Sequence, residues 1–340
     1  TFYRKTRWVV RGLGGEILTN VAGRGGTTWQ RSFLGTRQPQ SGNGTLAVVT
    51  GATGGIGAEV ATGLAQCGYR VIVAARNGHR GRELASRLCD MGGQAEFMEL
   101  HADKEESIAA FAASMRDRPI AILVNNAGVM SMSKDEIMRT NYVGTSLLTI
   151  ALLPSLQQHL SPRVVNVGSS SHLRAACADP NLLGCMELDR DLSAYAQSKL
   201  ALMQFSTLLR PSVPWLTVVD AHPGIVWTSM LQRHWGSVAP RLERSGLSRI
   251  LFKSPACGAA TILSAALSPR IPPRSWAEPS CWSRGWCAQP YFVNQRPGGY
   301  ASSESRDLEA ARLAWQAMVE PTAKELVPEG YRLFSEDLAN

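Results

Sequence analysis

The chain has 340 residues, 44% of them hydrophobic, and a formal net charge of +8. This length suits one large α/β domain with extensions, and the apolar content is enough for a substantial core. Residues 1–44 carry a net +6 (seven basic residues and one acid), which leaves only +2 for residues 45–340 and argues against nucleic-acid binding. No apolar run reaches the ~18 residues of a membrane-spanning helix. The cysteines form no C-x-x-C pattern, so no metal site is expected.

The basic N-terminal extension, residues 1–44, is Arg-rich, contains Ser and Thr, and has a single acid, a composition typical of transit peptides. It predicts an organellar location, with a mitochondrion favoured over a plastid and the endoplasmic reticulum surface as the alternative. A solvated basic tail is the simpler interpretation. Aromatic and arginine side chains together are enriched at interfaces, so contact with a protein or membrane-surface partner is expected from Phe2, Tyr3, Trp8, Trp29 and Phe33.

Strand-like and helix-like segments alternate from residue 45 to residue 125. Apolar runs predict strands at 46–50, 70–75, 95–100 and 120–124, and helical patterns fill 55–67, 79–91 and 105–116. This βαβ rhythm predicts an α/β fold, a Rossmann-type doubly wound parallel sheet covered on both faces.

A glycine-rich turn joins the first strand to the first helix and reads Thr50-Gly-Ala-Thr-Gly-Gly-Ile-Gly57. Glycines at 51, 55 and 57 let the backbone turn tightly and come close to a pyrophosphate at a helix N-terminus. Alone, this signal is weak evidence for a dinucleotide site.

The second half of the chain continues the pattern with further helices and strands. We expect helices at 134–159, 193–209 and 304–318 (the last capped by Ser303 or Ser305), and strands at 163–168, 215–221 and 291–293. Residues 270–288, rich in Pro, Trp, Ser and Arg, predict a surface insertion within one domain spanning 45–330. In the second helix, Tyr195 and Lys199 stand four residues apart and therefore share one helix face.

With the glycine turn and Y-A-Q-S-K in this order, the chain resembles the short-chain dehydrogenase/reductases, NAD(P)-dependent oxidoreductases on one Rossmann-type domain. It is most like the retinol-dehydrogenase-like and protochlorophyllide-reductase-like branch, because of R-V-V-N-V-G-S-S-S-H and of L-F-K-S-P-A-C-G-A-A-T-I-L at 251–263. The resemblance covers roughly residues 45–268 and resumes near 290–320. It also matches Asn125-Asn-Ala-Gly128, M-R-T-N-Y-V-G and Pro223-Gly224.

The resemblance implies a catalytic set of Asn141, Ser169, Tyr195 and Lys199. Tyr195 would carry the proton, Lys199 would lower the pKa of Tyr195 and grip the nicotinamide ribose, and Ser169 would donate a hydrogen bond to the substrate oxygen. Asn141 would hold a water that joins Lys199 to solvent. Residues 228–252 would form the substrate lid. Cofactor binding is implied at Gly51, Thr53, Gly55, Ile56, Gly57, Arg76, Asn125, Ala127, Gly128, Tyr195, Lys199, Pro223, Gly224, Val226 and Thr228.

Cofactor choice depends on the end of the second strand, V-I-V-A-A-R-N. NAD-dependent members usually carry an acid here, whereas this chain has Ala75 followed by Arg76, which suits a 2′-phosphate. NADP(H) is therefore the expected cofactor, with Arg80 as a second candidate contact. After the third strand, His101 stands where the family usually has an Asp that touches the adenine, and Asp103 lies two residues on. Either Asp103 makes this contact, or His101 replaces it, or the affinity for the cofactor is reduced.

The expected function is that of an NADP(H)-dependent oxidoreductase that transfers a hydride between nicotinamide and the carbonyl or alcohol of a small apolar substrate. The alternative is an accessory subunit of a larger organellar membrane complex that keeps the reductase fold and a bound cofactor. The extension and the insertion, which catalysis does not need, support this alternative and would form its protein or membrane-surface contacts.

Overall fold

The computed structural model describes residues 44–175, 190–268, 291–293, 296–297, 301–323 and 326. The basic extension apart from Gly44 and the whole of the insertion 270–288 lie outside the described residues.

The described strands form one central sheet in the order β3-β2-β1-β4-β5-β6-β7-β8. The first seven run parallel, and β8 pairs antiparallel with β7. Their bounds are β1 Leu46–Thr50, β2 Arg70–Ala75, β3 Gln94–Glu99, β4 Ile120–Asn125, β5 Arg163–Val167, β6 Thr217–His222, β7 Tyr291–Val293 and β8 Arg296–Pro297. The predicted doubly wound fold is confirmed.

The order in which strands are added to the sheet reverses between β1 and β4, because β2 and β3 lie on one side of β1 and the later strands lie on the other. In register, Val48 of β1 pairs with Ile72 of β2 and with Leu123 of β4. Ligands of open α/β sheets bind at the carboxyl ends of the strands at such a switch point. The topology therefore places a site after Thr50 and Asn125.

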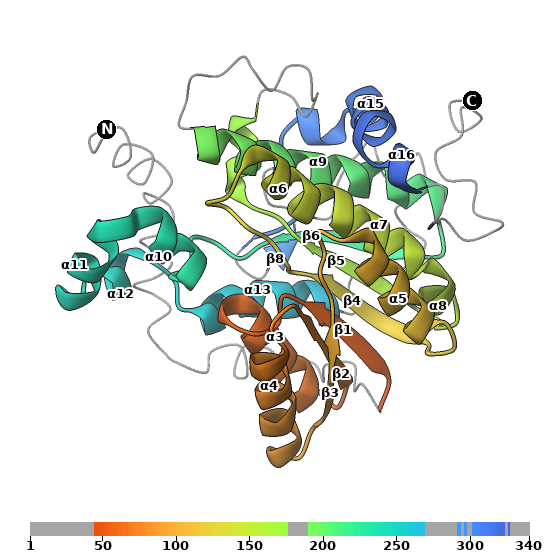
Figure 1. Ribbon diagram of the computed structural model, residues 1–340, viewed down its shortest axis with the longest axis horizontal. Coiled ribbons are helices and arrows are strands. Elements are labelled where there is room, and N and C mark those ends of the chain that lie inside the picture. The colour runs from red at the N-terminus through yellow and green to blue at the C-terminus, as the bar shows by residue number, and fades with distance from the viewer. Residues whose placement is uncertain are drawn as a thin grey trace.

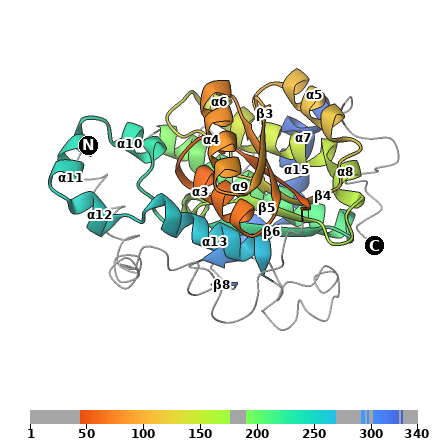
Figure 2. The same ribbon diagram turned by 90° about the horizontal axis from the view of Figure 1, so that it is seen from below.

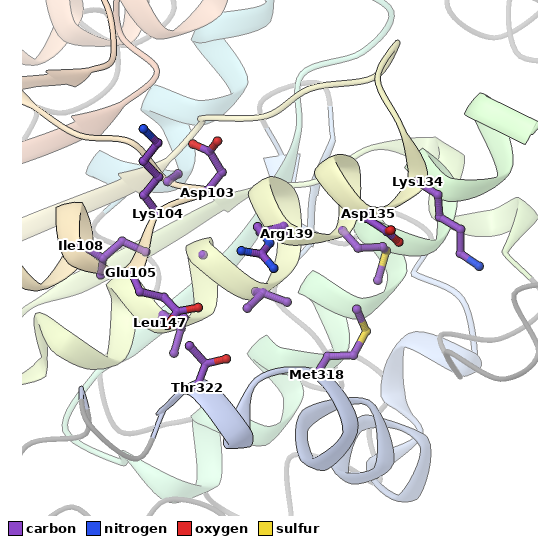
Figure 3. Close-up of a pocket in the computed structure, with 14 residues that line it drawn as sticks. Asp103, Lys104, Glu105, Ile108, Lys134, Asp135, Arg139, Leu147, Met318 and Thr322 are labelled. Atoms are coloured by element: carbon purple, nitrogen blue, oxygen red, sulfur yellow. The ribbon is translucent and has the colours of Figure 1, made fainter.

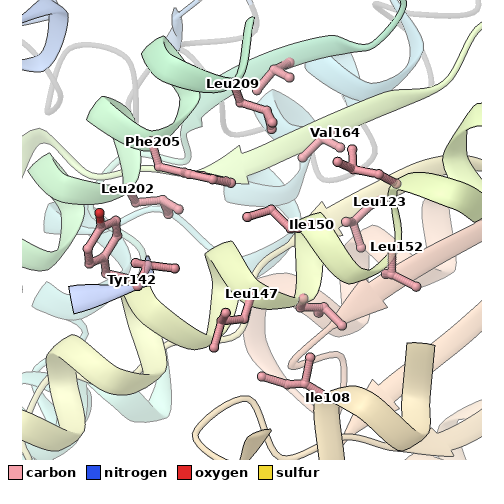
Figure 4. Close-up of a cluster of buried hydrophobic side chains, with 14 of the residues drawn as sticks. Ile108, Leu123, Tyr142, Leu147, Ile150, Leu152, Val164, Leu202, Phe205 and Leu209 are labelled. Atoms are coloured by element: carbon pink, nitrogen blue, oxygen red, sulfur yellow. The ribbon is translucent and has the colours of Figure 1, made fainter. Parts of the chain in front are cut away.

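Helices cover both faces of the sheet (Figure 1). One layer contains α3 Gly55–Gln66, α4 Gly78–Asp90 and α13 Pro255–Leu267. The other contains α5 Glu105–Met115, α6 Lys134–Met138, α7 Gly144–Ala151, α8 Leu153–Gln157 and α9 Arg190–Ser212, with α15 Leu308–Met318 packed against α9 and α16 Glu320–Ala323 against α15. Two cores result, one on each side of the sheet. Figure 4 shows part of the second, where Phe205 and Leu209 of α9 face Leu147 and Ile150 of α7 and Val164 of β5.

Two helices differ from the sequence-based expectation. The long helix expected at 134–159 is divided by a π-helical turn at Arg139–Val143, and again at Leu152, next to Pro154. The helix expected at 304–318 begins at Leu308, because Asp307 is its N-cap and accepts hydrogen bonds from the backbone of Glu309 and Ala310 at 3.0 Å. Residues 304–306 form a separate 3₁₀ turn.

The segment after β6 projects away from the sheet (Figures 1 and 2) and contains α10 Ser229–Trp235, α11 Ala239–Arg244 and α12 Leu247–Leu251. Its base is closed by two backbone bonds, Lys253 N to Ile225 O and Trp227 N to Lys253 O, both 2.9 Å. Glu243 of α11 accepts hydrogen bonds from Trp227 and from Gln232 of α10. In the described part of the chain, every helix is too short or too polar to span a membrane.

Candidate active site

The glycine turn after β1 is shaped for close backbone approach. Gly51 and Gly55 adopt positive φ angles of 63° and 55°, which side-chain-bearing residues rarely adopt. A Cβ on Gly57 would lie 2.4 Å from Asn126 Nδ2 and 2.5 Å from Gly51 O, so any side chain would collide with the turn. Asn126 in turn donates to Thr50 O at 3.0 Å and to Gly51 O at 3.2 Å, and so fixes the turn against β4.

Helix α3 starts directly at this turn. Its N-cap, Gly54, makes no side-chain capping bond, and the first turn of α3 has no acidic residue. The positive end of the helix dipole is therefore available to an anion. Together with the crowding at Gly57, this fits the pyrophosphate of a dinucleotide.

A cavity of about 450 Å³, the main cavity, extends from the glycine turn across the carboxyl ends of β1, β4, β5 and β6. It is lined by every predicted cofactor residue except Asn125: Gly51, Thr53, Gly55, Ile56, Gly57, Arg76, Ala127, Gly128, Tyr195, Lys199, Pro223, Gly224, Val226 and Thr228. Ser169 lines it as well. The structure thus brings residues from six separate chain segments to one site.

The end of the cavity beyond β2 is basic. Arg76 and Arg80 line it together with Asn77, and both arginines are exposed. Asn77 caps α4 by accepting from Arg80 N at 2.9 Å, which keeps the start of α4 beside Arg76. Ala75 also lines the cavity, where an acid would repel a phosphate.

After β3, the two candidate adenine contacts, Asp103 and His101, differ in position. Asp103 lines the main cavity, and its Oδ1 is buried without a hydrogen-bond partner among the described residues. His101 is not part of the lining, and its ring contacts Glu99 Oε1 at 2.9 Å.

Three of the four predicted catalytic residues, Ser169, Tyr195 and Lys199, meet on the wall of the main cavity. The hydroxyl groups of Ser169, which follows β5, and Tyr195, on α9, share a hydrogen bond. The ammonium of Lys199 lies 5.7 Å from the centre of the Tyr195 ring and donates to Val167 O at 2.8 Å. Helix α9 therefore presents Tyr195 and Lys199 to the end of β5, as their four-residue spacing predicts.

Burial dominates the electrostatics of this pair. It raises the pKa of Tyr195 above its ordinary value, and the hydrogen bond with Ser169 only partly opposes this. Burial also lowers the pKa of Lys199 to about 8. Burial thus outweighs the hydrogen bond with Ser169, and the lowering of the tyrosine pKa by Lys199 stays a prediction. Tyr195 holds its proton across the neutral range.

Asn141 lies behind the cavity rather than on its wall. It sits in the π-helical turn, is fully buried, and accepts from Val129 N at 2.8 Å. Its amide donates to Val129 O at 2.9 Å and to Ser198 Oγ at 3.0 Å. Asn141 thus joins the loop after β4 to α9, one residue before Lys199.

The structure does not bring Asn125 to the cavity. This side chain is buried at the end of β4 and donates to Thr149 Oγ1 at 2.9 Å and to Asn166 Oδ1 at 2.8 Å. The amide of Asn166 donates a hydrogen bond to Ser206 Oγ, and the Ser206 hydroxyl donates one to Asp220 Oδ1. Asn125 therefore belongs to a buried polar network beneath the site, and Asn126 is the asparagine that reaches the glycine turn.

An apolar cluster adjoins Tyr195 and draws largely on the segment 228–252, which sequence reasoning assigned to a lid. Met130, Leu231 and Phe252 are buried in it, and partly buried Tyr195, Ile225, Trp227, Met230, Trp235, Leu242 and Leu251 pack against them. Phe252 meets the rings of Trp227 and Trp235 at centroid distances of 4.8 and 6.0 Å. Met130 and Ile225, which lie outside the predicted lid, carry no local signal that would have identified them.

A second cavity, of about 370 Å³, lies between α5, α6, α7 and α16 (Figure 3). Charged side chains such as Lys104, Asp135 and Arg139 stand at its rim above Ile108 and Leu147. It shares Ala102 and Asp103 with the main cavity, and none of the four predicted catalytic residues lines it. Among the described residues, no group of His, Cys, Asp and Glu side chains is arranged to hold a metal ion.

A nucleotide-sized cavity at the switch point of a doubly wound sheet, with a Ser, a Tyr and a Lys at one end, is the arrangement of a nucleotide-dependent oxidoreductase. The chain belongs to the short-chain dehydrogenase family, whose model, described as short chain dehydrogenase, matches residues 45–237. The predicted family is confirmed.

Two relatives support the predicted retinol-dehydrogenase-like branch. The chain is 37% identical to a polyprenol dehydrogenase from Mus musculus over 252 residues, which cover 68% of this chain and 74% of the relative. It is 31% identical to retinol dehydrogenase 12 from Mus musculus, over 82% of this chain and 86% of the relative. Relatives are thus named as dehydrogenases, which confirms the prediction of an enzyme.

The fold also matches solved structures. An actinorhodin polyketide ketoreductase with NADPH superposes with a TM-score of 0.55 at 23% identity, over 67% of this chain and 92% of that one. At this identity the likeness shows the fold alone.

Proposed function

We propose that the protein is an NADP(H)-dependent oxidoreductase that interconverts the carbonyl and alcohol forms of an apolar substrate. One observation carries this proposal: a single cavity holds the glycine turn, the basic end at Arg76, and the Ser169–Tyr195–Lys199 group. Dehydrogenase relatives support the reaction class.

When bound, NADP(H) supplies or accepts the hydride. Tyr195, whose pKa burial raises, holds a proton at its hydroxyl and donates it to the oxygen of a carbonyl that is being reduced. Ser169, hydrogen-bonded to Tyr195, orients that oxygen with a fixed dipole. Lys199, held by Val167 O, keeps a cation beside the phenol and so favours the phenolate that remains after the proton has left.

Asn141 has a supporting role in this proposal. Its bonds to Val129 and Ser198 fix the loop after β4 relative to the helix that carries Lys199. A water between Asn141 and Lys199, expected from the resemblance, remains part of the proposal.

The preference for NADP(H) over NAD(H) rests on the basic end of the main cavity. Arg76 and Arg80 would make charge-assisted hydrogen bonds with the 2′-phosphate, and Ala75 leaves no acid to oppose it. Asp103 would contact the adenine. Fluorescence titration of the purified protein with NADPH and NADH tests this preference, and equal or reversed affinities would contradict it.

An apolar substrate is supported by the cluster around Met130, Leu231 and Phe252, which adjoins Tyr195. The names of the two relatives also include alcohols, polyprenol and retinol, that are largely hydrocarbon. NADPH consumption with a panel of long-chain and short polar aldehydes tests this part of the proposal. We expect turnover with the apolar members, and turnover confined to polar aldehydes would contradict it.

Contact with a protein or membrane-surface partner is proposed for residues 1–44 and 270–288, from their composition alone. The organellar location rests on the same extension. The comparisons do not favour the accessory-subunit alternative, because relatives are named as dehydrogenases.

A further inference from the structure

His172 is a buried histidine that the proposed mechanism does not use, although it ends the S-S-S-H motif that follows β5. It has no exposed surface and lies in the short 3₁₀ turn Ser170–Arg174, three residues after Ser169. Its Nδ1 is 2.6 Å from the carbonyl oxygen of Ser169, and its Nε2 is 3.3 Å from the backbone nitrogen of Ser302.

These two contacts define the hydrogen positions on the ring. A carbonyl oxygen only accepts and a backbone N–H only donates, so Nδ1 carries the hydrogen and Nε2 accepts. The imidazole is therefore neutral, and both of its nitrogen atoms are used. Burial lowers the pKa of His172, with a further lowering effect from His222, while Glu304 and the bond to Ser169 oppose it.

The segment on the other side of His172 is fastened to the helix that carries Tyr195. Gln204 of α9 donates to Glu304 O at 2.9 Å, and Thr207 of α9 donates to Ser305 O at 2.9 Å. Ser305 is itself bonded to Ser302 through both its backbone N–H and its hydroxyl. The turn 302–306 is thus hydrogen-bonded to α9, and its Ser302 N–H donates to Nε2 of His172.

The loop that contains His172 also contains Ser169, whose hydroxyl group orients the substrate oxygen in the proposed mechanism. Ser169 Oγ contacts Ser171 Oγ at 3.1 Å and accepts from Ser171 N at 3.2 Å, in addition to its bond with Tyr195. Tyr291 of β7 packs edge-on against the His172 ring at 5.5 Å and closes the space on that side. Rotation of the ring would therefore disturb Ser169 directly.

We propose that His172 is a positioning residue, which fixes Ser169 to the turn 302–306 and thereby to α9, the helix that carries Tyr195. Ser169 after β5 and Tyr195 on α9 are then held in one geometry by a buried ring that joins the Ser169 backbone to the turn 302–306. This inference rests on the proposed function, in which these two hydroxyl groups act on the substrate oxygen.

A pair of amide substitutions separates the two contacts of the ring. His172→Asn places an N–H donor near the position of Nδ1 and keeps the bond to Ser169 O. His172→Gln places an amide near the position of Nε2 and keeps only the contact with Ser302. If positioning of Ser169 matters, His172→Gln lowers kcat by about tenfold to a hundredfold, the cost of a misplacement of about 1 Å, and His172→Asn restores most of it.

The assay measures kcat and KM for an apolar aldehyde, the Kd of NADPH by fluorescence, and Tm for the wild type and both variants. We expect an unchanged NADPH Kd in both variants and a kcat loss mainly in His172→Gln. Equal kcat in His172→Gln and the wild type would overturn the inference. So would a parallel loss of kcat, NADPH binding and Tm in both variants, because that pattern indicates a role in folding alone. A wild type without turnover would instead overturn the proposed function on which the inference rests.

Discussion

Replacing Lys199 by Met should make the protein more stable and inactive. Lys199 is 4% exposed, and burial lowers its pKa from 10.5 to about 8. At about 1.4 kcal/mol per pKa step, keeping this ammonium charged near neutral pH costs about 3 kcal/mol. Met has a similar length, no charge and a flexible chain, so it can fill the same space.

The gain is reduced because Met cannot donate to Val167 O, to which Lys199 now donates at 2.8 Å. An unpaired buried carbonyl costs about 1–2 kcal/mol. We therefore expect Lys199→Met to raise the free energy of unfolding by about 1–2 kcal/mol near neutral pH, while turnover falls by about 10²-fold or more.

Urea denaturation without cofactor, followed by circular dichroism, measures the change. Lys134→Met, at an exposed position, is the matched control and should stay within about 0.5 kcal/mol of the wild type. Because the folded-state pKa of Lys199 lies below the unfolded value, the unfolded state holds more protons between pH 8 and 10.5. Wild-type stability should therefore rise through this window, and the advantage of the variant should shrink. A variant that is clearly less stable than the wild type would show that Lys199 is structural and would refute this reasoning.

Three further outcomes are expected. Tyr195→Phe should abolish turnover but keep the fold and most NADPH binding, because it removes one hydroxyl and little packing; near-native rates in a reductase assay would reject the assigned proton donor. Arg76→Ala should weaken NADPH binding by about tenfold or more and leave NADH binding nearly unchanged, since only the 2′-phosphate uses the guanidinium; fluorescence titration that gave equal losses for both would count against the assigned contact. Deletion of residues 1–40 should keep reductase activity and remove co-purification with a larger assembly or membrane fraction; unchanged co-purification, or loss of the isolated domain's stability, would argue against an interface there.

Local patterns in the sequence predicted the sheet, and the resemblance to a known family supplied the candidate site residues. Strands such as Ile120–Asn125 are continuous apolar runs because both faces of the sheet are covered, and the glycines at 51, 55 and 57 indicate the tight turn after the first strand. The spacing of Tyr195 and Lys199 fixes their common helix face wherever the helix packs.

Features that depend on tertiary packing were not accessible in this way. Side chains alternate at a strand end, so one residue decides whether Asn125 or Asn126 faces the cavity. The raised pKa of Tyr195 follows from burial, which a four-residue spacing does not report. Likewise, Asp307 rather than Ser303 or Ser305 caps α15, because the 3₁₀ turn 304–306 is bonded to Gln204 and Thr207 far back in the chain.

Transfer of deuterium from NADPH labelled at C4 to an apolar aldehyde tests the central claim most directly. Mass spectrometry of the product should find deuterium on the carbinol carbon with the wild type, and none above background with Tyr195→Phe. A wild type that transfers no label to any member of an apolar aldehyde and ketone panel, or a Tyr195→Phe variant that transfers as much as the wild type, would contradict the account.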